Sequence, residues 1–333
     1  MKNSKKILSL VLAAIMMFSC IALSSCGEKN KDDGKYSIGI IQLAPHVALD
    51  AATEGFKAVL VEEFGEENVE FIFVNAQGDN NACTTAVSDF VAKDVDLIMA
   101  NATAALQAAY NGTNKIPILG TSVTDYPTAL ALDREAYASN NGVIGSNVSG
   151  TSDLAPLDQQ AEMLVELYPD AQNVGLLYCS GEPNSQYQID VITPLLEAAG
   201  KTCTVYSFSN SNDVAQVAAA AAAGSDVIYV PTDNTAADCT GAILGAIGDT
   251  PIIAGEAGIC SGCGVATLSI SYEELGKVTG EMAVKILKGE AKVEEMAVQF
   301  ASTPAKMYNK ARCEELGMDV TALEAMGYVA IEG

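Results

Sequence analysis

The sequence is poor in the side chains that most catalytic and nucleic-acid-binding sites require. It has no tryptophan and one histidine, so a histidine-rich metal centre is excluded, and any Ser-His-Asp arrangement would depend on His46 alone. Positive charge is also scarce, because 18 lysines and arginines stand against 42 aspartates and glutamates, a net charge of −24. Such a polyanion repels phosphate backbones, which excludes nucleic acid as a partner.

Motifs for phosphate binding, nucleophilic catalysis and zinc binding are missing as well. No Gly-x-Gly-x-x-Gly or Walker-type loop follows a predicted strand, and neither Ser122 nor Ser180 lies in a Gly-x-Ser-x-Gly elbow. The pair Cys260 and Cys263, placed by the sequence in a glycine-rich loop, lacks the second pair or the histidines that a structural zinc site needs. A local disulfide and two plain thiols remain as alternatives for this pair. We therefore expect no enzymatic activity, no cofactor and no metal.

Residues 1–25 have the features of an export signal. Lysines near the N-terminus precede an almost unbroken apolar run from Ile7 to Leu23. The following Leu-Ser-Ser-Cys-Gly matches the lipobox of bacterial lipoproteins, in which Cys26 becomes the acylated N-terminus; the alternative is a signal anchor with an incidental cysteine. Residues 26–35 are polar and charged, as in a flexible tether. The sequence thus predicts an exported protein, anchored to the outer face of the cell membrane by a lipidated cysteine.

From Tyr36 onward, apolar strands and amphipathic helices alternate in two successive rounds. The predicted strands of the two rounds lie at 36–42, 69–74, 95–100, 116–119 and 143–145, and then at 174–178, 202–208, 227–230 and 251–254. Apolar strands separated by helices are typical of parallel sheets covered on both faces. The predicted fold class is α/β, with two doubly wound parallel-sheet lobes joined by a hinge. We expect lobe 1 to comprise 36–147 plus about 273–303, and lobe 2 to comprise 148–272 plus about 304–333.

Polar side chains gather where these strands end. In open parallel sheets ligands bind beyond the carboxyl ends of the strands, close to helix N-termini. The predicted ligand-binding residues are Gln42, His46, Ala102, Thr103, Thr121, Ser122, Thr151, Ser152, Glu182, Asn184, Asp233, Asn234 and Glu256. Helix capping without a ligand is the alternative for Thr103, Ser152 and Asn234. For Asp233, which directly follows an apolar strand, we favour a ligand ammonium over a structural cap, because an unpaired carboxylate there is unfavourable by several kcal/mol.

Several short segments, in order and spacing, resemble one known family. They are Ile-Gly-Ile-Ile-Gln at 38–42, His46 with Ala48-Leu-Asp50 and Gly55-Phe56, residues 116–122, Gly145 with 151–153, Asn173-Val-Gly175, and residues 230–234. On these residues the body from about 36 to 320 resembles the type I periplasmic-binding-protein fold. More narrowly, it resembles the solute-binding lipoproteins of ABC importers grouped with tryptophan- and tyrosine-binding members.

The resemblance implies an extracytoplasmic receptor that closes two lobes around a small molecule and delivers it to a membrane permease with its ATPase subunits. In related proteins the ligand is an amino acid, often aromatic. Hydroxyls and helix N-terminal amides at Thr103 and Ser122 are suited to a carboxylate, and Asp233 on the other lobe to an ammonium. A sensor domain of the same fold and a sugar- or nucleoside-binding protein are the alternatives.

The lipobox interpretation has a direct test. We expect Cys26→Ser to release the protein from membranes, because the thiol that carries the lipid is removed. Fractionation of cells expressing the two forms measures this. Retention of the variant in the membrane fraction through lipid would contradict the lipobox interpretation.

Overall fold

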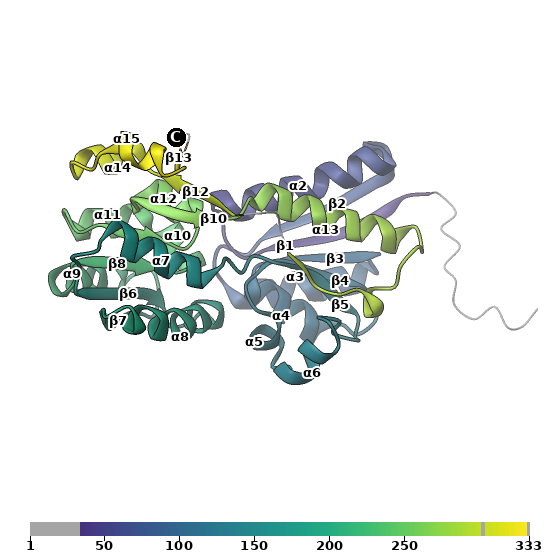
Figure 1. The fold of residues 1–333 in the computed structure, drawn as a ribbon. Helices are drawn as coiled ribbons and strands as arrows, with labels where there is room; N and C mark the ends of the chain where they lie inside the picture. The colour runs from purple at the N-terminus through teal and green to yellow at the C-terminus, as the bar shows by residue number, and fades with distance from the viewer. Residues whose placement is uncertain (1–33, 301–303, 332–333) are drawn as a thin grey trace, which may run out of the picture. The chain divides into compact units, whose positions relative to one another are not determined.

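The computed structural model describes residues 34–300 and 304–331, which form two parallel sheets with helices on both faces (Figure 1). The predicted signal segment and Cys26 lie outside these residues. Within the described part of the chain, no helix combines the length and apolar character needed to cross a membrane.

The first sheet has six strands in the order β11-β5-β4-β3-β1-β2. Their bounds are β1 (Tyr36–Gln42), β2 (Val69–Asn75), β3 (Leu97–Asn101), β4 (Ile118–Val123), β5 (Val148–Ser152) and β11 (Gln299–Phe300). The helices of this lobe are α2 (Val47–Phe64), α3 (Asn80–Lys93), α4 (Thr103–Gly112), α5 (Tyr126–Leu130), α6 (Arg134–Ser139) and α13 (Tyr272–Leu287). Apolar side chains of α3, α4 and α5 fill the core on one face, and those of α2 and α13 fill it on the other.

The second sheet has seven strands in the order β13-β12-β10-β9-β8-β6-β7. They are β6 (Asn173–Cys179), β7 (Thr202–Phe208), β8 (Val227–Val230), β9 (Ile252–Ala254), β10 (Ala266–Ser269), β12 (Ala305–Tyr308) and β13 (Val329–Ala330). The helices are α7 (Leu157–Leu167), α8 (Pro183–Ala198), α9 (Val214–Gly224), α10 (Asn234–Asp238), α11 (Thr240–Ile247), α12 (Ala257–Cys263), α14 (Lys310–Glu315) and α15 (Val320–Ala325). All described strand pairings in both sheets are parallel except that of β10 with β12, which is antiparallel.

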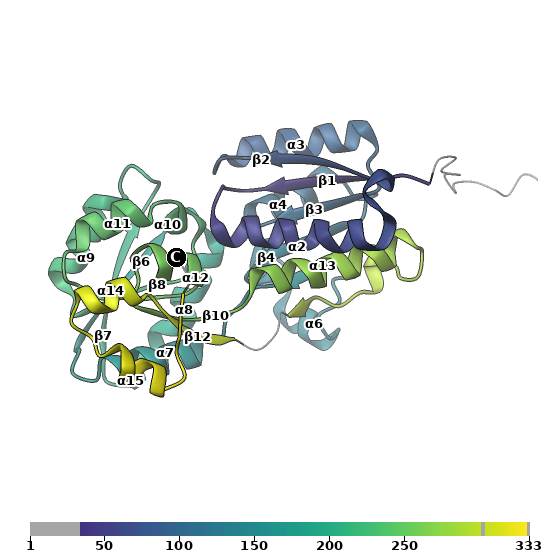
Figure 2. The ribbon, with the colours of Figure 1, turned by 90° about the horizontal axis from the view of Figure 1, so that it is seen from above.

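The chain passes between the two sheets along one edge. After β5 it leaves the first sheet for α7, after β10 it returns as α13, and from β11 it goes back to β12. Figure 2 shows α13 lying alongside α2, although more than 200 residues separate them in sequence. The α2–α13 pair therefore ties a late segment of the chain to the first lobe.

Several sequence predictions need correction. The strand that follows β4 in the first sheet is β5, not 143–145, where Val143 makes only an isolated bridge to Ala297. Residues 148–152 thus belong to the first sheet, and the predicted start of lobe 2 at 148 is too early. The short helices α5 and α6 were not predicted, and the helix expected over 236–247 is broken at Cys239 into α10 and α11.

The Cys260 and Cys263 segment is a helix rather than a loop. Both residues lie in α12, whose start is capped by the Glu256 side chain, and both are buried free thiols. Burial raises the pKa of the Cys263 thiol to about 12. The side-chain cap and the seven-residue helix that follows it override the glycines of this segment, which by composition favour a loop.

Close packing of α2 on α13 depends on a glycine. A Cβ at Gly276 would lie 2.0 Å from the carbonyl oxygen of Ala52, so only glycine lets the two backbones approach this far. We expect Gly276→Ala to lower the free energy of unfolding by about 1–3 kcal/mol, as overpacking does in cores. Urea unfolding measures the loss.

A matched control is Gly241→Ala in α11. A Cβ there meets nothing within 4 Å, so the substitution adds helix propensity alone. We expect it to leave stability unchanged or to raise it by about 0.5–1 kcal/mol. Equal effects of the two substitutions would show that the α2–α13 contact does not constrain position 276.

Candidate functional site

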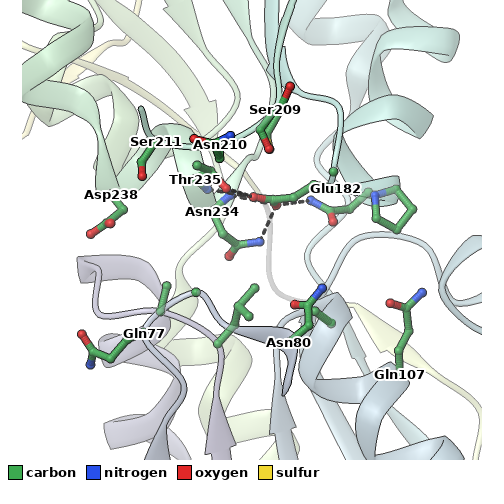
Figure 3. A pocket seen from close by; sticks show the side chains of 18 residues that line it. Gln77, Asn80, Gln107, Glu182, Ser209, Asn210, Ser211, Asn234, Thr235 and Asp238 are labelled. Carbon is green, nitrogen blue, oxygen red and sulfur yellow. Dashed lines mark hydrogen bonds between the residues drawn. The ribbon is translucent and has the colours of Figure 1, made fainter. Parts of the chain in front are cut away.

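Two neighbouring cavities lie between the ends of the strands of the two lobes. The outer cavity has a volume of about 280 Å³ and the inner one about 10 Å³, and Asn184 and Asn234 line both. Figure 3 shows the outer cavity, with Gln77, Asn80 and Gln107 of the first lobe facing Glu182, Asn234 and Asp238 of the second. The inner cavity is lined by His46, Leu49, Ser122, Thr124, Asp153, Asn184, Thr232, Asp233, Asn234, Ala237, Glu256 and Tyr272. At this volume the inner cavity has room for about one water molecule.

Three side-chain atoms on the wall of the inner cavity are buried without a hydrogen-bond partner. They are His46 Nδ1, Ser122 Oγ and Asp153 Oδ1, all from the first lobe. Buried polar atoms in native proteins are nearly always hydrogen-bonded, and an unpaired one is unfavourable by about 1–3 kcal/mol. Three such atoms on one small cavity are therefore suited to receive polar groups of a ligand.

Asp153 combines burial with an incomplete set of partners. It follows β5 directly, is 3% exposed, and accepts a hydrogen bond on Oδ2 from the Tyr272 hydroxyl at 2.8 Å. Burial raises the pKa of Asp153 to about 6, against the opposing effect of the hydrogen bond from Tyr272. An ammonium beside Oδ1 would supply both the missing hydrogen bond and the countercharge.

The acids of the second lobe have backbone partners instead. Glu182 accepts hydrogen bonds from the backbone N–H groups of Asn234 and Thr235 at the start of α10. Glu256 accepts from the N–H groups of Gly258 and Ile259 at the start of α12. Burial raises the pKa of Glu256, and the hydrogen bonds from the Gly258 and Ile259 N–H groups oppose this rise. These carboxylates are held by helix N-termini, as capping predicts.

Asp233 has the geometry of a structural cap. Its Oδ1 accepts from the Ala236 N–H at 2.8 Å and its Oδ2 from the Cys179 N–H at 2.7 Å. Burial and the Glu182 charge raise the pKa of Asp233, and the two N–H donors lower it. Both carboxylate oxygens of Asp233 thus accept hydrogen bonds inside the second lobe. This geometry supports the structural cap, the alternative that the sequence analysis favoured less than a ligand ammonium.

Two predicted residues of the first lobe stand in strained backbone. Ala102 has φ of 91° and Ser122 has φ of 53°, values that non-glycine residues rarely adopt. Ala102 precedes α4, a ten-residue helix that begins without a side-chain cap, and Ala104 in its first turn lines the outer cavity. Because the first N–H groups of a helix lack internal partners, this end of α4 is suited to a carboxylate.

The predicted site residues divide into two groups. Those that line a cavity are His46, Ser122, Glu182, Asn184, Asp233, Asn234 and Glu256. The remaining six line neither cavity: Gln42, Ala102, Thr103, Thr121, Thr151 and Ser152.

Hydrogen bonds inside the first lobe explain the position of most of the second group. Gln42 is bonded to Asp50 and Thr53 of α2. Thr151 bridges Thr121 and Thr279, which fastens α13 to the sheet. Ser152 donates to the Thr124 carbonyl and is a residue of β5, not a helix cap. Polar residues at strand ends here join the lobe's own elements as often as they face the cleft.

The sequence analysis missed Asp153 as a site residue, along with Thr124 and Tyr272. The strand prediction at 143–145 placed Asp153 in a passage between lobes instead of at the end of a strand. Assigning Val148–Ser152 as the strand would have put Asp153 at the carboxyl end, where ligand groups are expected.

The charge of the site limits what it can bind. Among the described residues that line the two cavities, none is lysine or arginine. In the same described ranges, no three His, Cys, Asp or Glu side chains are grouped so as to hold a metal ion. The walls therefore favour a ligand with a positively charged group, and anions have only helix N-termini to bind.

Comparison with known proteins agrees with this geometry. The family described as ABC transporter substrate binding protein matches residues 37–330. A tyrosine-binding protein of Clostridioides difficile (strain R20291) is 32% identical over 342 residues, which cover 99% of this chain and 97% of that protein.

Two solved structures have the same fold, one with a bound ligand and one without. The ABC domain from Streptococcus pneumonia in complex with L-Trp is 30% identical, with a TM-score of 0.82 over 89% of this chain and 100% of that one. A ligand-free, open structure of a substrate-binding protein with adhesive properties from Clostridium difficile is 35% identical over the same shares, but its TM-score is 0.67. The predicted α/β fold and the prediction that the protein is not an enzyme are confirmed: the chain belongs to the family of ABC transporter substrate-binding proteins.

Proposed function

We propose that this protein is the extracytoplasmic, lipid-anchored subunit of an ABC importer and captures an amino acid, preferably aromatic, between its lobes. The observation that carries the ligand class is the set of buried, unpartnered atoms on the inner cavity, Asp153 Oδ1, Ser122 Oγ and His46 Nδ1. The permease and its ATPase are the partners that the family implies. Attachment through Cys26 depends on the lipobox alone.

The zwitterion is assigned to neighbouring strand ends of the first lobe. The ammonium binds at Asp153, after β5, and the carboxylate at Ser122 of β4 and the uncapped start of α4. The Ala102 N–H donates to the Thr121 carbonyl at 3.0 Å and the Asp153 N–H to the Val123 carbonyl at 3.3 Å, so the ends of β3, β4 and β5 lie close enough for one ligand to span them. This arrangement pairs each charge of an amino acid with a site of opposite polarity.

Aromatic preference is supported by the relatives, one named for tyrosine and one solved with L-Trp. The side chain would extend from the inner cavity into the outer one, which the shared residues Asn184 and Asn234 connect. The outer cavity is lined by apolar residues such as Leu43 and Ala44 together with amides, hydroxyls and acids, so a hydroxyl-bearing ring such as that of tyrosine is favoured there.

Closure of the lobes supplies the coupling to transport. The TM-score is higher against the L-Trp complex than against the open, ligand-free structure, in spite of the lower sequence identity. The inner cavity of about 10 Å³ also favours a closed arrangement, so the lobes must separate to admit a ligand. A ligand that contacts both lobes binds the closed state better than the open one, and this difference drives closure.

The first test compares Asp153 and Asp233 as the binding site of the ligand ammonium. We expect Asp153→Asn to weaken L-tyrosine binding by about 10- to 150-fold, the loss of one charge-assisted hydrogen bond. We expect Asp233→Asn to leave affinity within about threefold while lowering stability by about 1–3 kcal/mol, because the Cys179 N–H loses its acceptor. Calorimetric titration and thermal unfolding measure both, with the exposed Asp158→Asn as control. An equal loss of affinity at Asp233 would restore it as the ammonium site.

The second test uses the dependence of stability on pH. Because the pKa of Asp153 is raised to about 6 in the folded state, the folded form holds its proton more tightly than the unfolded form. The protein should therefore lose stability as pH rises from about 4 to about 6, by about 3 kcal/mol from this group. Asp153→Asn should be more stable than the parent protein at neutral pH and equal to it near pH 3. If the difference in stability between Asp153→Asn and the parent protein stayed constant across this pH range, the raised pKa of Asp153 would be contradicted.

A further inference from the structure

His46, the single histidine of the chain, reaches from one lobe to the other. It precedes α2 of the first lobe, and it makes no cap for that helix. Its Nε2 lies 3.2 Å from Oδ1 of Asn234, at the start of α10 in the second lobe. The imidazole is thus a direct polar contact across the cleft.

The orientation of Asn234 decides which atom donates in this contact. Its Nδ2 lies 2.8 Å from Glu182 Oε2, and its backbone N–H lies 3.0 Å from the same oxygen. Since a carboxylate oxygen that accepts these bonds needs a donor opposite it, the amide nitrogen faces Glu182 and Oδ1 faces His46. An amide oxygen only accepts, so the proton of the His46 contact lies on Nε2.

This tautomer leaves Nδ1 as an acceptor. In a neutral imidazole with its proton on Nε2, Nδ1 carries a lone pair. Nδ1 is buried on the inner cavity and has no partner. With the proton on Nδ1 instead, Nε2 and Asn234 Oδ1 would be two acceptors facing each other, and the contact between the lobes would be lost.

We propose that His46 links ligand capture to lobe closure through its tautomer. A ligand N–H donates to Nδ1, this holds the proton on Nε2, and Nε2–H donates to Asn234 of the second lobe. No proton is transferred; the ligand selects one of two neutral forms of the ring. The inference rests on the proposed function in one respect: the ligand carries the ammonium that we assign next to Asp153.

Glu182 extends this contact into the second lobe. Its two carboxylate oxygens accept from Asn234 and Thr235, and the residue itself precedes α8. The chain from ligand to His46, Asn234 and Glu182 therefore ends at the first turns of α10 and α8. A ligand lacking an N–H at this position would bind the first lobe without favouring this contact.

The tautomer can be observed directly, because one histidine gives one set of ring signals. We expect ¹⁵N-histidine NMR of the intact protein at about pH 8, where an ordinary imidazole is neutral, to show a protonated Nε2 and an unprotonated Nδ1 when L-tyrosine is bound. The free protein should show exchange between both tautomers. A bound form with the proton on Nδ1, or no change on ligand addition, would overturn the proposal.

A double-mutant cycle tests the coupling. His46→Asn keeps an acceptor near the Nδ1 position but is too short to reach Asn234, and Asn234→Ala removes the partner. We expect each to weaken L-tyrosine binding about tenfold, and the double variant to be no weaker than either one, since both break the same link. Losses that multiply to about a hundredfold would overturn the link between His46 and Asn234.

Ser185→Ala is the matched control. Ser185 lies in the first turn of α8 and lines neither cavity. The substitution removes the hydrogen bond of the Ser185 hydroxyl to the Thr232 carbonyl and leaves the contact between His46 and Asn234. We expect an affinity change below about threefold, and a tenfold loss would assign the effect to the start of α8 instead. Failure of the parent protein to bind any amino acid in the same titration would overturn the proposed function, whereas binding with multiplying losses would overturn the tautomer link alone.

Discussion

The site is organised by buried carboxylates that lie between the two lobes with no lysine or arginine among the described residues that line the cavities. Each acid must find N–H or O–H donors, because a bare buried charge is strongly unfavourable. Glu182, Asp233 and Glu256 find them at helix N-termini of the second lobe. Asp153 of the first lobe has one oxygen bonded to Tyr272 and the other without a partner.

This difference gives the two lobes different tasks. In the second lobe the acidic side chains accept hydrogen bonds from the N–H groups at the starts of α10 and α12. These carboxylates therefore have hydrogen-bond partners without a ligand. The first lobe keeps its strained strand ends and the uncapped α4 available at the cleft. Asp153 and Tyr272 both lie where the chain passes between the sheets, so a ligand bound there contacts the hinge directly.

Much of this could be predicted from the sequence because parallel strands are apolar throughout and their ends are polar. That pattern located most strands, including β1 and β8, and it placed His46, Ser122 and Glu256 near the cleft. It failed for β5, whose Val-Ser-Gly-Thr-Ser has little apolar character and is held by pairing with β4 on one side and β11 on the other. It also failed for α12, where a side-chain cap outweighs glycine content.

The fold class, the lack of catalytic motifs and the family follow from residue types and their spacing along the chain. Which polar residues line the two cavities depends on how distant segments pack together. Thr151 bonds to Thr121 and to Thr279 of α13, a helix more than a hundred residues later in the chain, and Asp233 accepts from the backbone of β6. Whether a buried polar atom has a hydrogen-bond partner depends on donors from distant segments, and these donors cannot be predicted from the residues next to it in sequence.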